Sequence, residues 1–272
     1  MAYAQAAHEG VLFGGEDSSN RALGDTWVWK SGCWTQLQPS PSPPAAYSLA
    51  SAYDKARGTF MVYRADLGTW IWDGQKWTSP SASRPQLIGQ AAYDESARRI
   101  LMFGMSLNGG AAQTWTWDGS NWTQVGVAIS PAARFDAGMV FDPALQRVLL
   151  FGGINATNQP LEDTWSWDGA NWAQLSPKTS PPARGGAAIT AFAAKHIVVL
   201  IGGYSPVGAG RMLADVWIWD GANWSASNGI GPVGSASAID TGPTVLVFGG
   251  ASDQVNATNR TWTWDGANWS AS

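Results

Sequence analysis

Short strand-like segments alternate with polar turns along the whole chain, and residues 127–176 show the order most clearly. A segment rich in small residues is followed by a continuous apolar run that ends in a glycine pair, then by an alternating aromatic segment and a last short strand. Short apolar runs and strict alternation are both typical of β-strands. Four strands are therefore predicted, at 135–141, 147–151, 164–167 and 172–175. Between the last two, Asp168–Asn171 carries the Asp-Gly pair of a tight antiparallel hairpin.

The same order recurs along the chain, and tryptophan marks it. All 18 tryptophans fall into six copies of the pattern Trp-x-Trp followed five residues later by a third Trp. The copies are Trp27/Trp29/Trp34, Trp70/Trp72/Trp77, Trp115/Trp117/Trp122, Trp165/Trp167/Trp172, Trp217/Trp219/Trp224 and Trp262/Trp264/Trp269. Because so scarce a side chain occurs only at these spacings, the chain is predicted to be one supersecondary unit repeated from end to end.

A single four-stranded unit is too small to bury both of its faces, so the units are expected to stack radially around an axis. The sequence predicts an all-β, six-bladed β-propeller with four antiparallel strands in each blade. The blades are placed at about residues 1–38, 39–82, 83–126, 127–176, 177–228 and 229–272, so that 1–272 is one domain.

The repeat resembles the kelch repeat of bacterial proteins. The shared features are the Phe-Gly-Gly that ends the second strand, the aromatic third strand, the Asp-Gly turn and the Trp that opens the fourth strand. The resemblance implies a propeller whose innermost strands line a central channel, and it implies little about function, since kelch proteins include binding modules, scaffolds and some enzymes. Blades two and three depart from it, with Tyr63-Arg64 and Gly104-Met105 in place of the double glycine. The loops that follow are expected to differ.

Two ways of ending the ring remain open. Blade one aligns only from Met1, in mid-strand, and the last strand of blade six stops at Ser272. The pattern fits a chain trimmed at its ends, and it fits a ring that is closed only by side-chain packing between blades one and six.

Charge is scarce, at 13% of residues against about 25% in typical proteins. The net charge is -4 and no basic run exceeds Arg98-Arg99, which argues against a nucleic-acid partner. The longest apolar stretches, such as 197–201, are only strand-sized, so no membrane insertion is expected. Low charge and many Ser, Thr and Asn residues favour an extracellular or cell-surface protein, although the first residues do not form a secretory signal. A monomer is expected.

Residues that usually carry chemistry are few. His8 and His196 fall in first-to-second strand turns of blades one and five, too far apart to share a metal. With Cys33 as the only cysteine, they exclude the copper site of the kelch-containing galactose oxidases. No catalytic or phosphate-binding motif occurs, so neither a metal nor a cofactor is predicted. The tryptophans are interpreted as core between blades rather than as sugar platforms. The acids before each turn glycine are interpreted as turn residues: Asp73, Asp118, Asp168, Asp220 and Asp265.

A candidate binding site is predicted at the face that carries the second-to-third strand loops. These loops vary most, from 65–68 in blade two to 204–215 in blade five, and variable loops on a rigid ring are typical of recognition sites. In kelch propellers the residue that begins each innermost strand faces the channel mouth. From blade two to blade six this position holds Ala46, Gln86, Arg134, Arg184 and Pro232.

Two guanidinium groups on neighbouring blades would suit a carboxylate or an acidic peptide. The predicted ligand-binding residues are Arg134, Arg184, Arg64, Gln86, Asp136 and Tyr204. The alternative for Arg134 and Arg184 is that they donate hydrogen bonds to carbonyls of the next blade and lock the ring.

Two functions from different classes fit these observations. The first is a non-catalytic binding or scaffold propeller that recognises a protein, a peptide or a glycan, possibly anionic, at the loop-bearing face. The second rests on a resemblance to kelch-type bacterial sialic acid epimerases. It is an enzyme of the epimerase or mutarotase kind, in which Arg134 and Arg184 hold the carboxylate of a small sugar acid and Asp136 moves protons.

Overall fold

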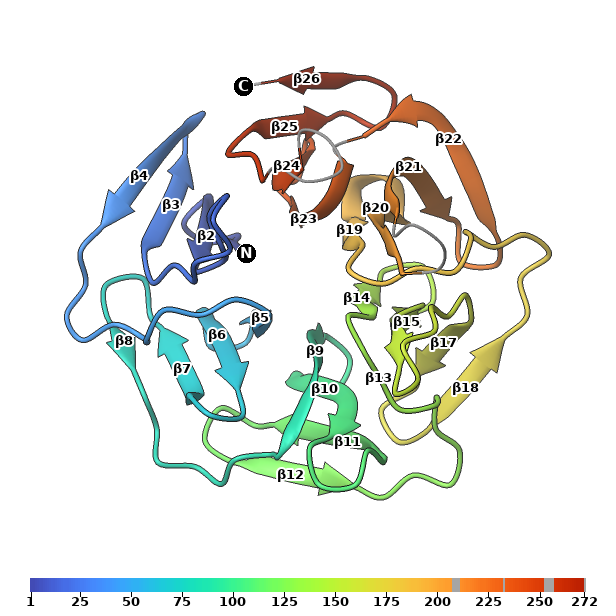
Figure 1. Ribbon diagram of the computed structural model, residues 1–272. Helices are drawn as coiled ribbons and strands as arrows, with labels where there is room; N and C mark the ends of the chain where they lie inside the picture. The colour runs from blue at the N-terminus through green and yellow to red at the C-terminus, as the bar shows by residue number, and fades with distance from the viewer. Residues whose placement is uncertain (207–210, 232, 252–256, 272) are drawn as a thin grey trace.

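The computed structural model of the chain describes residues 1–206, 211–231, 233–251 and 257–271. Six four-stranded antiparallel sheets surround a common axis (Figure 1), and in each sheet the strand order follows the chain. The predicted all-β, six-bladed propeller is therefore confirmed. Blade one is β1 Ala2–Ala4, β2 Glu9–Phe13, β3 Thr26–Lys30 and β4 Cys33–Leu37; blade two is β5 Ala50–Asp54, β6 Thr59–Arg64, β7 Gly68–Trp72 and β8 Trp77–Thr78; blade three is β9 Leu87–Asp94, β10 Arg99–Ser106, β11 Ala112–Trp117 and β12 Trp122–Val125. Blade four is β14 Gly138–Asp142, β15 Arg147–Phe151, β17 Thr164–Trp167 and β18 Trp172–Leu175; blade five is β19 Ala188–Phe192, β20 Ile197–Ser205, β21 Arg211–Trp219 and β22 Trp224–Ile230; blade six is β23 Val233–Asp240, β24 Val245–Ala251, β25 Thr261–Trp264 and β26 Trp269–Ala271.

Two details differ from the expected pattern. The blade-five loop predicted at 204–215 is in large part strand, because β20 and β21 extend past the double glycine and pair Tyr204 with Met212; residues 207–210 lie outside the described ranges. In blade four the innermost strand is interrupted. A two-residue strand, β13 (Arg134–Phe135), pairs with β16 (Ile154–Asn155) before β14 begins. Among the described residues, no helix has the length and apolar character needed to cross a membrane.

The third tryptophan of each motif is a wedge between two blades. The ring of Trp172 lies 5.3 Å from that of Trp167 in its own hairpin and 5.2 Å from that of Phe103 in the preceding blade. The same pair of contacts recurs at Trp77, Trp122 and Trp224. Tilted aromatic pairs at this spacing stabilise a core beyond the effect of their buried area. None of the 18 tryptophans is exposed, which confirms them as core between blades.

In five of the six copies a threonine ties the wedge to the preceding blade. The Trp172 indole N–H donates to the Thr114 hydroxyl at 3.0 Å. The threonine is the residue directly before the first tryptophan of the preceding copy. Equivalent bonds join Trp77 to Thr26, Trp122 to Thr69 and Trp224 to Thr164.

Blades one and six meet through these same contacts. Trp34 of blade one donates to Thr261 of blade six at 3.0 Å and packs on Phe248 with ring centroids 5.1 Å apart. All four strands of blade one come from 2–37, and all four of blade six come from 233–271. Blades one and six are thus joined by side-chain packing.

The wedge at blade six lacks its acceptor. Val216 stands where five blades have threonine, and the Trp269 indole N–H is buried with no hydrogen-bond partner among the described residues. Replacing Val216 by threonine should supply that acceptor without changing the shape of the side chain. We expect this variant to raise the free energy of unfolding by about 1 kcal/mol, measured by urea denaturation.

The control for that variant is Val247→Thr. Val247 is also fully buried, but it does not occupy the wedge-acceptor position. Its cross-strand partners, Ala238 and Trp262, carry no buried unsatisfied side-chain group, so a hydroxyl there should destabilise the protein. Equal losses in the two variants would contradict the assignment of position 216 as a missing acceptor.

The turn aspartates are confirmed as turn residues. In the third-to-fourth turns of blades two to six the Asp Oδ1 accepts the N–H groups two and three residues further on, at 2.7–2.9 Å. These backbone hydrogen bonds hold the pKa of each carboxyl below its usual value. The carboxylates therefore stabilise the hairpins rather than forming a site.

Candidate functional site

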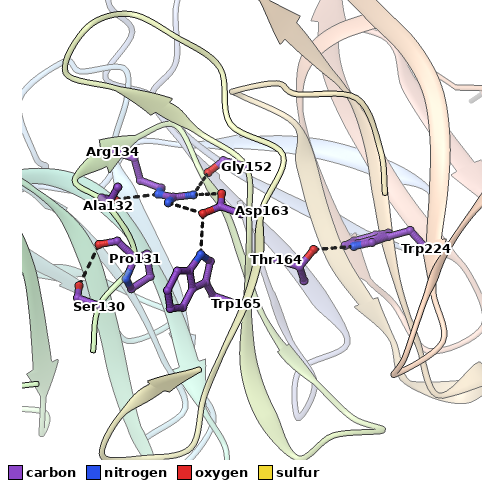
Figure 2. Close-up of polar contacts among 9 residues, drawn as sticks. All are labelled: Ser130, Pro131, Ala132, Arg134, Gly152, Asp163, Thr164, Trp165 and Trp224. Carbon is purple, nitrogen blue, oxygen red and sulfur yellow. Dashed lines mark hydrogen bonds and ion pairs between the residues drawn. The ribbon is translucent and has the colours of Figure 1, made fainter. Parts of the chain in front are cut away.

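Arg134 is buried inside blade four, where it joins three parts of that blade (Figure 2). Its side chain is 1% exposed. Nε donates to the Ala132 carbonyl at 2.9 Å, Nη1 to the Gly152 carbonyl at 2.8 Å, and Nη1 and Nη2 reach both oxygens of Asp163. The second Asp163 oxygen also accepts the Trp165 indole N–H at 2.7 Å. Four of the five guanidinium N–H groups are thus used within the blade.

Blade five repeats this arrangement with Arg184. Its Nε donates to Pro182, its Nη1 to Gly202, and its two terminal nitrogens form a bidentate pair with Asp215. This side chain is also 1% exposed. The prediction that Arg134 and Arg184 converge on an open mouth is therefore corrected, because both guanidinium groups are enclosed and hydrogen-bonded. The alternative is also corrected in one respect, since the side chains lock their own blade and not the next one.

The aspartate explains why the arginine is buried. Burial alone would raise the pKa of Asp163, but the hydrogen bonds and the charge of Arg134 hold it below its usual value. Both residues are therefore ionised and fully paired. The sequence carries a signal for this pairing: an Asp two residues before the first tryptophan occurs together with the arginine in blades four and five, and blades two and three lack both.

Asp136 and Tyr204 form a second group, which bridges blades four and five. The Tyr204 hydroxyl donates to Asp136 Oδ2 at 2.8 Å, and the Gly186 N–H donates to the Asp136 carbonyl at 2.8 Å. Asp136 has a φ of 52°, in the left-handed region, and the equivalent residue of blade five is Gly186 with a φ of 61°. An aspartate tolerates this kink between β13 and β14 less well than glycine does. The carboxyl is thus placed here at some cost in backbone strain.

Asp136 should make stability depend on pH in the opposite sense to the turn aspartates. Burial raises the pKa of Asp136 above its usual 3.8, and the Tyr204 hydrogen bond opposes this rise. The stability that it contributes is therefore fully present below pH 3.8 and is lost as pH rises through the raised value. We expect Asp136→Asn to be more stable than the wild type at pH 7, because the amide accepts the same hydrogen bond without a charge. The advantage should shrink toward pH 4 in thermal unfolding.

Asp168→Asn is the matched comparison for that prediction. The lowered pKa of Asp168 means that its ionised form stabilises the fold above its usual pKa and that this contribution is lost as pH falls. This variant should be less stable than the wild type at pH 7. An Asp136→Asn variant with the pH profile of the wild type would show that the Asp136 carboxyl is not desolvated.

The other two predicted site residues, Arg64 and Gln86, lie on blades two and three. Arg64 forms a bidentate pair with Asp66 and donates to the Tyr47 carbonyl at 3.3 Å. Arg84, which is exposed, donates to the Asp66 carbonyl at 3.4 Å, and the Gln86 side chain donates to the Arg84 carbonyl at 3.4 Å. Arg84 forms no ion pair with any described residue.

The exposed large apolar side chains lie on this same face. Within the described ranges, the exposed large apolar residues are Tyr47, Ile88, Leu107 and Ile129, each at least 43% exposed. Tyr47 and Ile129 lie in blade-to-blade connections, Leu107 lies in the second-to-third loop of blade three, and Ile88 pairs with Met105 beside it. We call these four residues, together with Arg64 and Arg84, the loop-face patch. Sequence reasoning found Arg64 and Gln86 but missed the apolar members, whose exposure depends on the loops.

The described residues contain no group of three or more His, Cys, Asp or Glu side chains that could hold a metal ion. No protein-family model matches the sequence, and no match is found among curated proteins. The fold is similar to the solved structure of YjhT, a kelch-repeat protein, with a TM-score of 0.68 and 13% sequence identity. The match covers 92% of this chain and 91% of that one. At this identity the likeness shows the fold alone.

Proposed function

We propose that this chain is a non-catalytic binding propeller, built from kelch repeats of the bacterial type, that holds a protein partner on the loop-face patch. The observation that carries the proposal is the one-sided exposure of Tyr47, Ile88, Leu107 and Ile129. Exposed apolar groups that gather on one face mark interaction sites in soluble proteins. A partner of this kind fits better than a glycan, because aliphatic side chains outnumber aromatic ones in the patch.

The charged residues of the loop-face patch restrict the chemistry of the partner further. Arg84 stands exposed in the patch without a carboxylate, whereas Arg64 is neutralised by Asp66. An incoming segment that combines apolar side chains with an acidic residue would cover the apolar groups and pair with Arg84. In blades four and five, by contrast, Arg134 and Arg184 are enclosed by their own aspartates.

Selection of peptides from a random display library against the purified protein tests this function. The selected peptides should combine apolar residues with Asp or Glu. Their binding should fall at least tenfold in Leu107→Glu, which places a charge in the patch, and severalfold in Arg84→Ala. Ala6→Glu, at an exposed position of a first-to-second turn on the opposite face, is the control. Peptides that bind all three variants as well as the wild type would defeat the proposal.

A further inference from the structure

A cavity of about 210 Å³ lies on the axis of the ring. Its walls are the innermost strands of all six blades, β1, β5, β9, β14, β19 and β23, which surround the centre of Figure 1. Residues of the first-to-second turns, including Gln5, Lys55 and Glu95, complete the lining. The cavity therefore opens on the face opposite the loop-face patch. It could hold about seven water molecules at ~30 Å³ each, or one small organic molecule.

One position of the repeat lines this cavity in every blade, and the type of residue at that position differs between the blades. This position lies on the first strand of each blade. It pairs with a residue of the second strand, and that residue pairs in turn with the second tryptophan of the motif on the third strand. In blades one to four it holds Tyr3, Tyr53, Tyr93 and Phe141. In blade five it holds Ala191 and in blade six Asp240. The lining thus has aromatic residues in blades one to four, with Tyr93 and Phe141 largely buried in the cores between blades, and a small residue and a carboxylate in blades five and six.

Asp240 brings a charge into this gap that nothing in the described structure neutralises. Its Oδ2 accepts the Ala193 N–H at 2.9 Å and its Oδ1 accepts the Gly242 N–H at 2.8 Å. It forms no ion pair among the described residues. Asp240 and Tyr3 line the cavity from the neighbouring strands β23 and β1. Burial and, to a lesser degree, the charge of Asp240 raise the pKa of Tyr3.

The other charged side chains of the lining pair with one another, and burial lowers the pKa of the Met1 amino group, which also lines the cavity, to about 6. Lys55 and Glu95, from the turns of blades two and three, form an ion pair with one another. Their pairing leaves Asp240 as the uncompensated group among the described side chains of the lining. A bound anion would be repelled there, and a neutral molecule would leave the carboxylate without a counter-charge.

We propose that the axial cavity binds a small organic ammonium ion that carries an apolar or aromatic body. The ammonium group would pair with Asp240 and lie near the electron-rich faces of the tyrosine rings, which attract cations. The apolar body would occupy the space that blade five leaves by having Ala191 in place of an aromatic residue. The site is independent of the loop-face patch, since the two open on opposite faces of the ring.

Three probes of nearly equal size test the charge requirement. Binding of benzylammonium, benzyl alcohol and benzoate to the whole protein can be followed by NMR, with the tyrosine ring resonances as the readout. We expect benzylammonium to bind about tenfold more tightly than benzyl alcohol, an effect in the range of a cation–π contact with an ion pair, and benzoate to bind most weakly. Equal affinities for the three probes, or no response of the tyrosines to benzylammonium, would overturn the proposal.

Two variants locate the site. Asp240→Asn should remove the preference for benzylammonium over benzyl alcohol. Ala191→Phe restores the aromatic residue of blades one to four, and it should abolish binding of all three probes while the fold is kept. Ala191→Phe also keeps the proposal testable if loss of the Asp240 hydrogen bonds unfolds the first variant. Leu107→Ala, on the opposite face, should bind every probe as the wild type does. Benzylammonium binding that survives Ala191→Phe would place the probe elsewhere and defeat the assignment.

Discussion

Replacing Trp172 by alanine is expected to lower the free energy of unfolding by about 3–5 kcal/mol, the usual range for a buried tryptophan. Its side chain is 1% exposed, packs at an angle against the rings of Trp167 and Phe103, and donates to Thr114. Truncation removes the apolar burial, leaves a cavity between blades three and four, and leaves the Thr114 hydroxyl without its donor. Urea denaturation followed by far-ultraviolet circular dichroism measures the loss without relying on the other tryptophans.

A gentler substitution separates packing from hydrogen bonding in this wedge. Trp172→Phe keeps an aromatic ring against Phe103 but removes the indole N–H. We expect a smaller loss than in Trp172→Ala. If Trp172→Ala costs less than about 1 kcal/mol, well below the range for core truncation, the wedges do not hold the blades together.

The wedge that closes the ring should respond differently. Trp34 is only half-buried, and it joins blades one and six, which are not consecutive along the chain, whereas every other wedge joins consecutive blades. For Trp34→Ala we expect lost hydrogen-exchange protection mainly in β1–β4 and β23–β26, because the other blades keep their own wedges. Uniform loss of protection around the ring would contradict closure by this local contact.

The tryptophans and the turn aspartates could be predicted from the sequence because their roles are local and repeated. Each turn aspartate meets its backbone partners within three residues, so its role does not depend on the rest of the fold. Each wedge recurs at one spacing, so six copies specify one packing solution. The threonine acceptors were missed, although a signal was present: threonine precedes the first tryptophan in five of the six copies. Their role appears only when the neighbouring blade is in place.

The sequence predicts Arg134 and Arg184 at an open mouth because their exposure depends on a backbone kink that the repeat pattern does not reveal. The chain kinks just after each arginine, at Asp136 and Gly186, with a positive φ in both. A strand running straight from the mouth of the channel would have presented these side chains to solvent. Next to the kink, each arginine side chain instead points into its own blade. Arg134, for example, reaches Gly152 and Asp163. The two blades that carry these arginines also carry an aspartate two residues before the first tryptophan, Asp163 and Asp215. This coincidence would have favoured a buried ion pair within each blade.

The two candidate sites come from departures from the repeat, not from the repeat itself. Blades two and three lost the double glycine and the enclosed arginine, and they carry much of the loop-face patch. Blades five and six lost the aromatic residue that lines the axis, and the gap contains Ala191 and Asp240. A regular ring buries its polar groups and fills its channel in every blade. Irregular positions are therefore where a ligand or a partner finds room.

Removing one member of an enclosed ion pair is expected to be nearly as damaging as removing a wedge. In Arg134→Ala, the carboxylate of Asp163 loses its counter-charge and the Gly152 and Ala132 carbonyls lose a donor inside the blade. Breaking a buried pair in this way costs about 3–5 kcal/mol; since Asp163 keeps some contact with water, we expect the lower end. Arg64→Ala removes an exposed pair with Asp66 and should cost less than about 1 kcal/mol.

A double variant shows whether the loss arises from the unpaired charge. Arg134→Met together with Asp163→Leu removes both charges and keeps apolar volume in the blade. Because no carboxylate is then left without a counter-charge, the double variant should be more stable than Arg134→Ala, even though the Trp165 indole N–H loses its acceptor. Urea denaturation of the three variants side by side gives the comparison. If Arg134→Ala unfolds no more easily than Arg64→Ala, the guanidinium of Arg134 is free to leave the blade, and it becomes available again as a ligand for an anion at the mouth of the channel.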